Sequence, residues 1–147
     1  MLADKLIIRD AKIDDVEELA SLMNELGYST SVSEMTARMK PVFVHPDYKT
    51  IVAVLNEKVV GMAGLYKGLF YENNGQYMRI AAFVVKQSRR EQGIGKLLIG
   101  AAEAWAVTQA INTVVISSRN RDERRAAHAF YQKMGYAIKS SGFIKYL

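Results

Sequence analysis

Residues 89–100 read RREQGIGKLLIG, and they place two glycines one residue apart between a basic polar segment and an apolar run with helical spacing. The first turn of a helix carries N–H groups that have no partner within the helix, and the positive end of the helix dipole lies there, so this end attracts anions. Gly93 and Gly95 carry no side chain that would keep a phosphate away, while Arg90 and Lys96 add positive charge. The stretch therefore predicts either a phosphate-binding helix start or a helix start whose glycines serve only a tight turn.

Two common nucleotide-binding motifs are excluded by their own spacing. A Walker A loop needs a glycine five residues before Gly95 and Ser or Thr directly after the lysine, but the chain has Arg90 and Leu97 at these positions. A dinucleotide-binding fingerprint needs glycine or alanine three residues beyond Gly95, where Leu98 stands. A phosphate site in this stretch therefore belongs to neither class.

The flanking sequence predicts a mixed sheet with helices around it. Apolar residues recur with helical spacing in residues 14–27 and 31–40, and we expect Pro41 to end the second of these helices. The predicted strands cover residues 6–11, 50–55, 59–66, 77–85 and 113–118, and the later predicted helices cover residues 95–107 and 123–135. Residues 136–147 are expected to finish the chain as a hairpin that turns at Ser141 and Gly142. We therefore expect an α/β (α+β) fold in the order βααβββαβαβ, with a mixed, mostly antiparallel central sheet flanked by helices.

The composition is that of a globular domain. The chain has 147 residues, of which 50% are hydrophobic and 24% are charged, and this is enough to build a core and argues against disorder. We expect a single domain over residues 1–147 with no membrane span and no signal peptide, and hence a cytoplasmic location. The sequence contains no cysteine and only two histidines, so we expect no disulfide, no cysteine nucleophile and no metal site.

The net charge of +5 favours an anionic partner. Charge alone does not distinguish nucleic acid from a phosphorylated small molecule, and a well-solvated basic surface explains it equally well. A small basic nucleic-acid binder would rest on this charge alone, and we therefore expect no nucleic-acid partner.

Two segments resemble motifs of the GNAT superfamily of N-acetyltransferases. The acyl-CoA loop of that family has the pattern R/Q-x-x-G-x-G/A at the end of a central strand, and Arg90, Gly93 and Gly95 match it within FVVKQSRREQGIGKLLI, residues 83–99. Residues 127–136, AHAFYQKMGY, are similar to a later helix of the family in which A-x-x-F-Y-x-x-x-G-F/Y recurs. The expected order of elements along the whole chain also matches the family fold.

The resemblance implies an acetyl-CoA-dependent N-acetyltransferase in which an amine attacks the thioester directly. It implies that backbone N–H groups of the loop bind the pyrophosphate of CoA, and the residues concerned are Arg90, Glu91, Gln92, Gly93, Ile94, Gly95 and Lys96. Phe83, Val84 and Val85 precede them on the strand, and the backbone of Val85 is expected to pair with the pantetheine arm and to polarise the thioester carbonyl through its N–H.

The same resemblance implies three contacts from the later helix. Tyr131 matches the family tyrosine that faces the CoA sulfur and protonates the departing thiolate, and a phenol with a pKa of about 10 carries its proton at neutral pH. Arg124 and His128 are further candidates for contact with CoA. The alternatives are a solvated basic face for Arg124, packing for His128 and a boundary aromatic for Tyr131.

The strand before the loop departs from the family pattern. Many members carry a glutamate three residues before the position of Val85, and this chain has Ala82 there. Removal of a proton from an ammonium substrate would then fall to Glu72, His45 or Tyr77, or to water leading to solvent, which we rank first. The loss of the usual carboxylate also keeps open an alternative function as a catalytically silent CoA-binding sensor or interaction module.

The acceptor is expected to be a small-molecule or peptide amine. Polar residues of the first two helices and the connecting loops are candidates to line its cleft, namely Glu25, Glu34, Asp47, Tyr48, Glu72 and Tyr77. An acidic lining would suit polyamine, aminoglycoside or lysine substrates, whereas the alternative is that these residues are ordinary surface. The sequence leaves open the identity of the amine, the exact acyl group and the formation of a homodimer.

Overall fold

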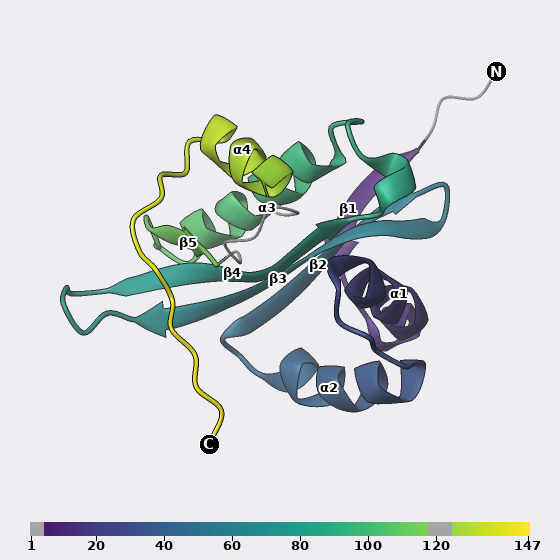
Figure 1. Cartoon of the computed structure of the whole chain (residues 1–147), viewed down its shortest axis with the longest axis horizontal. Helices are drawn as coiled ribbons and strands as arrows, with labels where there is room; N and C mark the ends of the chain where they lie inside the picture. Colours follow the sequence, from purple (N-terminus) through teal and green to yellow (C-terminus); the bar gives the residue numbers. More distant parts are fainter. Residues whose placement is uncertain (1–4, 118–124) are drawn as a thin grey trace. The chain divides into compact units, whose positions relative to one another are not determined.

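The computed structural model describes residues 5–117 and 125–147, which divide into two compact units, residues 1–117 and 118–147 (Figure 1). The first unit contains the sheet and its covering helices. The second contains one helix, α4 (Arg125–Lys133), and the C-terminal segment.

The sheet of the first unit has five strands in the order β1-β2-β3-β4-β5. The strands are β1 (Leu6–Asp10), β2 (Tyr48–Leu55), β3 (Lys58–Leu69), β4 (Gln76–Val85) and β5 (Val114–Ile116). Neighbouring strands are antiparallel except for β4 and β5, which are parallel. The predicted mixed, mostly antiparallel sheet is thus confirmed for these five strands.

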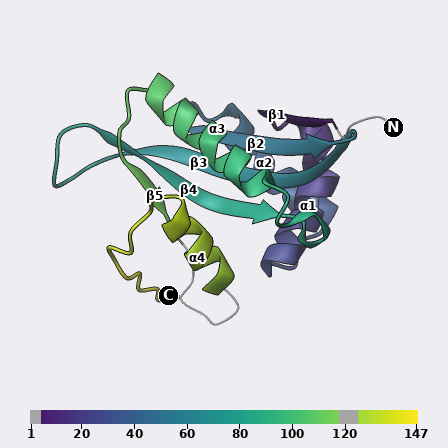
Figure 2. The same cartoon turned by 90° about the horizontal axis from the view of Figure 1, so that it is seen from above.

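Helices cover both faces of this sheet. They are the short 3-10 helix η1 (Ile13–Asp15), α1 (Val16–Leu26), α2 (Val32–Val44), the 3-10 helix η2 (Gln87–Arg89) and α3 (Ile94–Thr108). Figures 1 and 2 show α1 and α2 on one side of the sheet and α3 on the other. In the described ranges, no helix combines the length and the apolar character that crossing a membrane requires.

One buried cluster joins α1 and α2 to their face of the sheet. Its buried members are Leu19, Ala20, Leu22, Met23, Met35, Met39, Val52, Val54, Val59, Met62 and Val84. Adjacent residues of a strand point to opposite faces, so Gly61 faces α3 when Met62 faces this cluster. A Cβ atom on Gly61 would lie 3.0 Å from Leu98 Cδ1 and 3.6 Å from Ile94 Cγ2. Gly61 therefore lets α3 pack directly on β3.

The prediction that Pro41 ends the second helix is wrong, because α2 continues through Pro41 to Val44. Proline lacks an N–H and disturbs the preceding turn, which normally disfavours this arrangement. Here Val42 and Phe43, which follow the proline, pack against the buried cluster. Burial of these two side chains offsets the cost of proline in the last turn.

The predicted C-terminal hairpin is also wrong, because residues 136–147 form no strand. The alternating apolar residues that suggested it are largely exposed, with Ile138, Phe143 and Ile144 at 72%, 97% and 78%. A two-stranded hairpin is only marginally stable without a further strand or a helix to pack against. An alternating pattern is therefore not sufficient to form strands here.

A partly buried ion pair fixes the start of α1 to the edge of the sheet. Arg9 donates two hydrogen bonds to the carboxylate of Asp15, at 2.8 and 3.0 Å, and the N–H of Lys12 donates a third at 2.9 Å. Asp15 is only 4% exposed. The hydrogen bonds from Arg9 hold the pKa of this carboxyl below its ordinary value. Asp15 thus contributes stability in its charged form.

We predict that Asp15→Asn lowers the free energy of unfolding by about 1–3 kcal/mol at neutral pH, because charge-assisted hydrogen bonds are lost at a buried site. A lowered folded-state pKa stabilises the protein above the unfolded-state value, and this contribution is lost as the pH falls toward the folded-state value. The difference from wild type should therefore shrink below about pH 4. Urea unfolding at several pH values measures it.

The control is Asp14→Asn, which removes the same charge from the neighbouring exposed residue and should leave stability nearly unchanged. An equal loss in both variants, or a difference between Asp15→Asn and wild type that is unchanged in acid, would contradict the role of the ion pair.

Candidate functional site

Strand β4 is paired along one edge by β3 but along only part of the other edge by β5. Its pairing with β3 extends from Gln76 to Val85, whereas its pairing with β5 covers only Met78, Arg79 and Ile80. Beyond Ile80, no strand in the described residues pairs with the β5 side of β4. The C-terminal half of β4 therefore offers a strand edge on which another chain or a ligand can form hydrogen bonds.

The direction of the backbone along this edge follows from one hydrogen bond. The N–H of Lys86 donates to the carbonyl of Val60, 2.7 Å away, so residue 86 faces β3. Backbone groups alternate in direction along a strand, and those of Phe83 and Val85 consequently face away from β3. The carbonyl of Val85 accepts a hydrogen bond from Arg90 Nε at 3.2 Å.

A short loop connects β4 to α3 and is tied to α1. After η2 the backbone takes left-handed conformations at Glu91, with φ 65°, and at Gly93, with φ 83°. Nothing lies within 4 Å of the position where a Cβ of Gly93 would stand, so the backbone angle, and not crowding, is what favours glycine there. The N–H of Gln87 donates to Glu25 Oε1 of α1 at 2.9 Å.

The first turn of α3 can bind an anion. The first hydrogen bond within the helix runs from the N–H of Leu97 to the carbonyl of Gly93, at 3.2 Å, so the N–H groups of Ile94, Gly95 and Lys96 have no intrahelical acceptor. The cap residue Gly93 has no side chain to accept from them, and the first turn contains no acidic residue. The positive end of the helix dipole lies at these N–H groups.

The structure brings most of the predicted site residues together along one continuous path. Phe83, Val84 and Val85 end β4, residues 90–93 form the loop, and Ile94, Gly95 and Lys96 begin α3. Ile94 is buried and anchors this turn, while Lys96 is exposed.

The other three predicted residues belong to the second unit of the chain. Arg124 lies outside the described residues. His128 and Tyr131 lie on α4. Tyr131 is 7% exposed, and the centre of its ring lies 5.8 Å from the centre of the Phe130 ring.

Ala82, at the position where many family members have a glutamate, has apolar surroundings. Ala82 is half-buried and packs against the cluster of α1 and α2. Of the three side chains considered as a replacement base, His45 accepts a hydrogen bond from the N–H of Asp47 at 3.0 Å, and the ring of Tyr77 lies 5.2 Å from that of Phe70. Glu72 is exposed between β3 and β4.

Three of the four acidic residues considered for the acceptor cleft make other contacts, and the fourth, Glu72, is exposed. Glu25 holds the loop, and Glu34 and Ser31 cap α2 through two reciprocal hydrogen bonds of 3.0 Å. Asp47 lies 3.9 Å from Lys67 Nζ. The sequence did not reveal the role of Glu25, because its partner lies 62 residues further along the chain.

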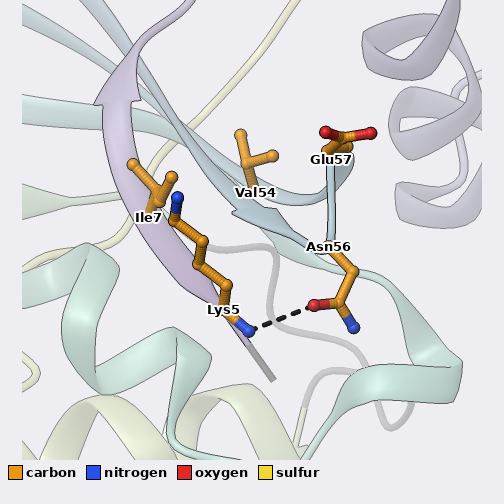
Figure 3. A pocket seen from close by; sticks show the side chains of 5 residues that line it. All are labelled: Lys5, Ile7, Val54, Asn56 and Glu57. Atoms are coloured by element: carbon orange, nitrogen blue, oxygen red, sulfur yellow. Dashed lines mark hydrogen bonds between the residues drawn. The ribbon is translucent and has the colours of Figure 1, made fainter. Parts of the chain in front are cut away.

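A pocket of about 490 Å³ opens at the opposite edge of the sheet and is lined by Lys5, Ile7, Val54, Asn56 and Glu57 (Figure 3). Its rim is held by a hydrogen bond from the N–H of Lys5 to Asn56 Oδ1, at 3.1 Å. None of the predicted site residues lines it. In the part of the chain that the structure describes, no group of three His, Cys, Asp or Glu side chains could hold a metal ion.

Residues 13–136 match the sequence model of the Acetyltransferase (GNAT) family. The chain is 32% identical to a GNAT family acetyltransferase from Staphylococcus aureus, with a TM-score of 0.82 over 97% of this chain and 98% of the other. None of the curated proteins compared with the chain matches it.

Two more distant structures share the fold. An aminoglycoside N-acetyltransferase, AAC(6')-Iy, solved with CoA, is 14% identical, with a TM-score of 0.85 over 99% of this chain and 97% of the other. Glucosamine-6-phosphate N-acetyltransferase from Arabidopsis thaliana is 21% identical, with a TM-score of 0.81 over 97% and 98%.

We predict that Glu25→Ala speeds hydrogen exchange at the amide of Gln87 by roughly threefold to tenfold, because the variant removes the acceptor that protects this N–H. Exchange measured by NMR on the whole chain gives the rate. Glu25→Gln keeps an acceptor oxygen and should change the rate less. The control Glu17→Ala shortens another exposed glutamate of α1 and should have no effect at Gln87. Unaltered exchange in Glu25→Ala would show that this contact does not hold the loop.

Proposed function

Because the chain belongs to the GNAT acetyltransferase family, we propose that it is an acetyl-CoA-dependent N-acetyltransferase in which a primary amine attacks the thioester directly. The observation that carries this proposal is the open first turn of α3 directly beside the unpaired edge of β4. One feature suits a pyrophosphate, and the other suits the amide groups of a pantetheine arm. The family match spans both compact units, which supports a single acetyltransferase domain over residues 1–147.

The loop residues bind the cosubstrate in this proposal. N–H groups between Arg90 and Lys96 donate to the pyrophosphate, and the exposed side chains of these two residues add positive charge. Bound acetyl-CoA supplies the activated acetyl thioester. Phe83, Val84 and Val85 lie along the pantetheine arm.

Val85 acts through its backbone. Arg90 already donates to its carbonyl, and its N–H, which faces away from β3, is the group that donates to the thioester carbonyl. A preorganised donor of this kind stabilises a developing oxyanion by about 3 kcal/mol.

Tyr131 is the proposed general acid. Its phenol protonates the departing thiolate, which a group with an ordinary pKa of about 10 can do at neutral pH. The support comes from the family motif in residues 127–136. His128 and Arg124, on the same segment, are proposed to contact CoA.

The proposed route for the substrate proton is water that leads to solvent. Ala82 offers no carboxylate, and Glu72, His45 and Tyr77 lie on other segments, where His45 and Tyr77 make local contacts. The same alanine supports a second candidate function, a CoA-binding sensor without turnover. Measurement of CoA release with a panel of amines distinguishes the two, because a sensor binds acetyl-CoA and releases no thiol above the rate of its spontaneous hydrolysis.

We predict that Gly93→Val abolishes thermal stabilisation by acetyl-CoA. The substitution puts a β-branched side chain beside the N–H groups that bind phosphate and strains a backbone with φ 83°. Thermal shift against acetyl-CoA concentration measures the loss. Gly100→Val is the matched control, since Gly100 lies on the exposed side of the same helix with open space around it. Unchanged affinity for acetyl-CoA in a folded Gly93→Val protein would overturn the proposed pyrophosphate site at the start of α3.

We predict that Tyr131→Phe keeps acetyl-CoA binding but slows acetyl transfer by about tenfold to a hundredfold, because only the hydroxyl is removed. Steady-state rates with the best acceptor, with chemistry shown to limit turnover, give the effect. Tyr146→Phe removes a hydroxyl from a tyrosine that is 83% exposed and should not change the rate. A rate equal to wild type across the pH range would remove Tyr131 from the mechanism.

A further inference from the structure

An arginine interrupts the apolar run of β4. Arg79 lies in YMRIAAFVV and is the only charged residue of that segment. It pairs with Tyr66 of β3 on one side and with Val115 of β5 on the other. The next residue, Ile80, is the last that pairs with β5. Arg79 therefore stands where the free edge of β4 begins.

The guanidinium of Arg79 is held in place by neutral groups. Its Nη1 donates to the hydroxyl of Ser117, just beyond β5. Its central carbon lies 5.7 Å from the centre of the Tyr77 ring, a distance that allows a cation–π contact. Tyr77 pairs with Gly68, and a Cβ on that glycine would lie 2.5 Å from the ring. The ring thus lies directly over the backbone of β3 and forms a fixed platform.

The positive charge of Arg79 has no counterion in the described part of the chain. None of the ion pairs there includes it, and its Nε is buried with no hydrogen-bond partner among these residues. A buried donor without an acceptor costs free energy, and the cost is greater for a charged group. Arginine presents its N–H groups as a planar fork that matches a carboxylate or a phosphate.

The distance from Arg79 to the proposed acetyl position limits the size of the acceptor. Arg79 and Val85, whose N–H is proposed to meet the thioester carbonyl, are six residues apart on one strand, which corresponds to roughly 16–20 Å between their Cα atoms. The register of β3 and β4 shifts at this place, because Gly64 pairs with Ala82 while Leu65 pairs with Ile80. A molecule that lies along this part of β4 can place one end at the guanidinium and its amine near the end of the strand.

We propose that Arg79 forms an anion subsite, which selects acceptor amines that carry a carboxylate or phosphate at the end distant from the reacting nitrogen. This inference rests on the proposed acetyltransferase function and adds the substrate class. It disfavours polycationic amines, because their distal positive charge would meet the positive guanidinium of Arg79.

The test compares acceptors that differ only in the distal group. The probes are ω-aminocarboxylates of graded chain length, the amino alcohols of the same lengths and the corresponding diamines, each with acetyl-CoA. We expect kcat/KM of the wild type to be highest for the carboxylates at one optimal length. Arg79→Gln should lower kcat/KM for these carboxylates by roughly 10- to 100-fold, the usual contribution of a charge-assisted hydrogen bond, and leave the amino alcohols unchanged. Arg79→Lys should restore part of the preference, because it keeps the charge without the fork.

Two controls separate this inference from the proposed function. Lys40→Gln removes an exposed positive charge from α2 and should keep the wild-type preference. Thermal stabilisation by acetyl-CoA should be the same in Arg79→Gln and wild type, which would show that the proposed acetyl-CoA site is intact in the variant. Acetylation of amines without any preference for the carboxylates, or a preference that survives in Arg79→Gln, would overturn the subsite while the acetyltransferase function stands.

If the chain acetylates none of these amines, the proposed function is overturned, but the subsite can still be tested by binding. NMR titration of wild type and Arg79→Gln with the best-fitting aminocarboxylate, in the presence of CoA, then measures binding directly. Binding that is lost in Arg79→Gln supports the anion subsite, and the absence of binding to wild type overturns it.

Discussion

The unequal pairing of β4 is the constraint on which the candidate site depends. A strand that had complete neighbours on both edges would use all of its backbone groups within the sheet. β3 pairs with β4 from Gln76 to Val85, but β5 pairs with only three residues of β4. The groups of Phe83 and Val85 that face away from β3 are thereby left beside the loop that starts α3. A free strand edge beside the open start of α3 therefore follows from one short strand.

Packing holds these two features in register. Gly61 allows Ile94 and Leu98 to lie against β3, which fixes the first turn of α3 relative to β4. On the other face, Glu25 accepts the N–H of Gln87 and ties the loop to α1. The loop between β4 and α3 is exposed to solvent, yet both of its ends are attached to buried elements. A binding site on such a loop needs little ordering when a ligand arrives.

Features with a local cause could be predicted from the sequence, and features with a distant cause could not. The hydrophobic period and the turn residues predicted five strands and the helices around them, and the glycines at 93 and 95 predicted the helix start. The predictions at Pro41 and for the C-terminal hairpin are wrong because tertiary packing, and not local pattern, decides whether a helix continues or a strand forms. The contact of Glu25 with Gln87 and the setting of Arg79 depend on strand register, which no local pattern records. The roles of Tyr131 and Val85 remain predictions.

The absence of a carboxylate at Ala82 gives positioning more weight in the proposed chemistry. A general base typically contributes a hundredfold or more to the rate, and water that leads to solvent replaces only part of this. Precise placement of the reacting groups can contribute more than that, because it removes translational and rotational freedom before the reaction begins. An acceptor fixed at one end by Arg79 and lying along β4 would gain such placement from an element that the sheet already holds rigid.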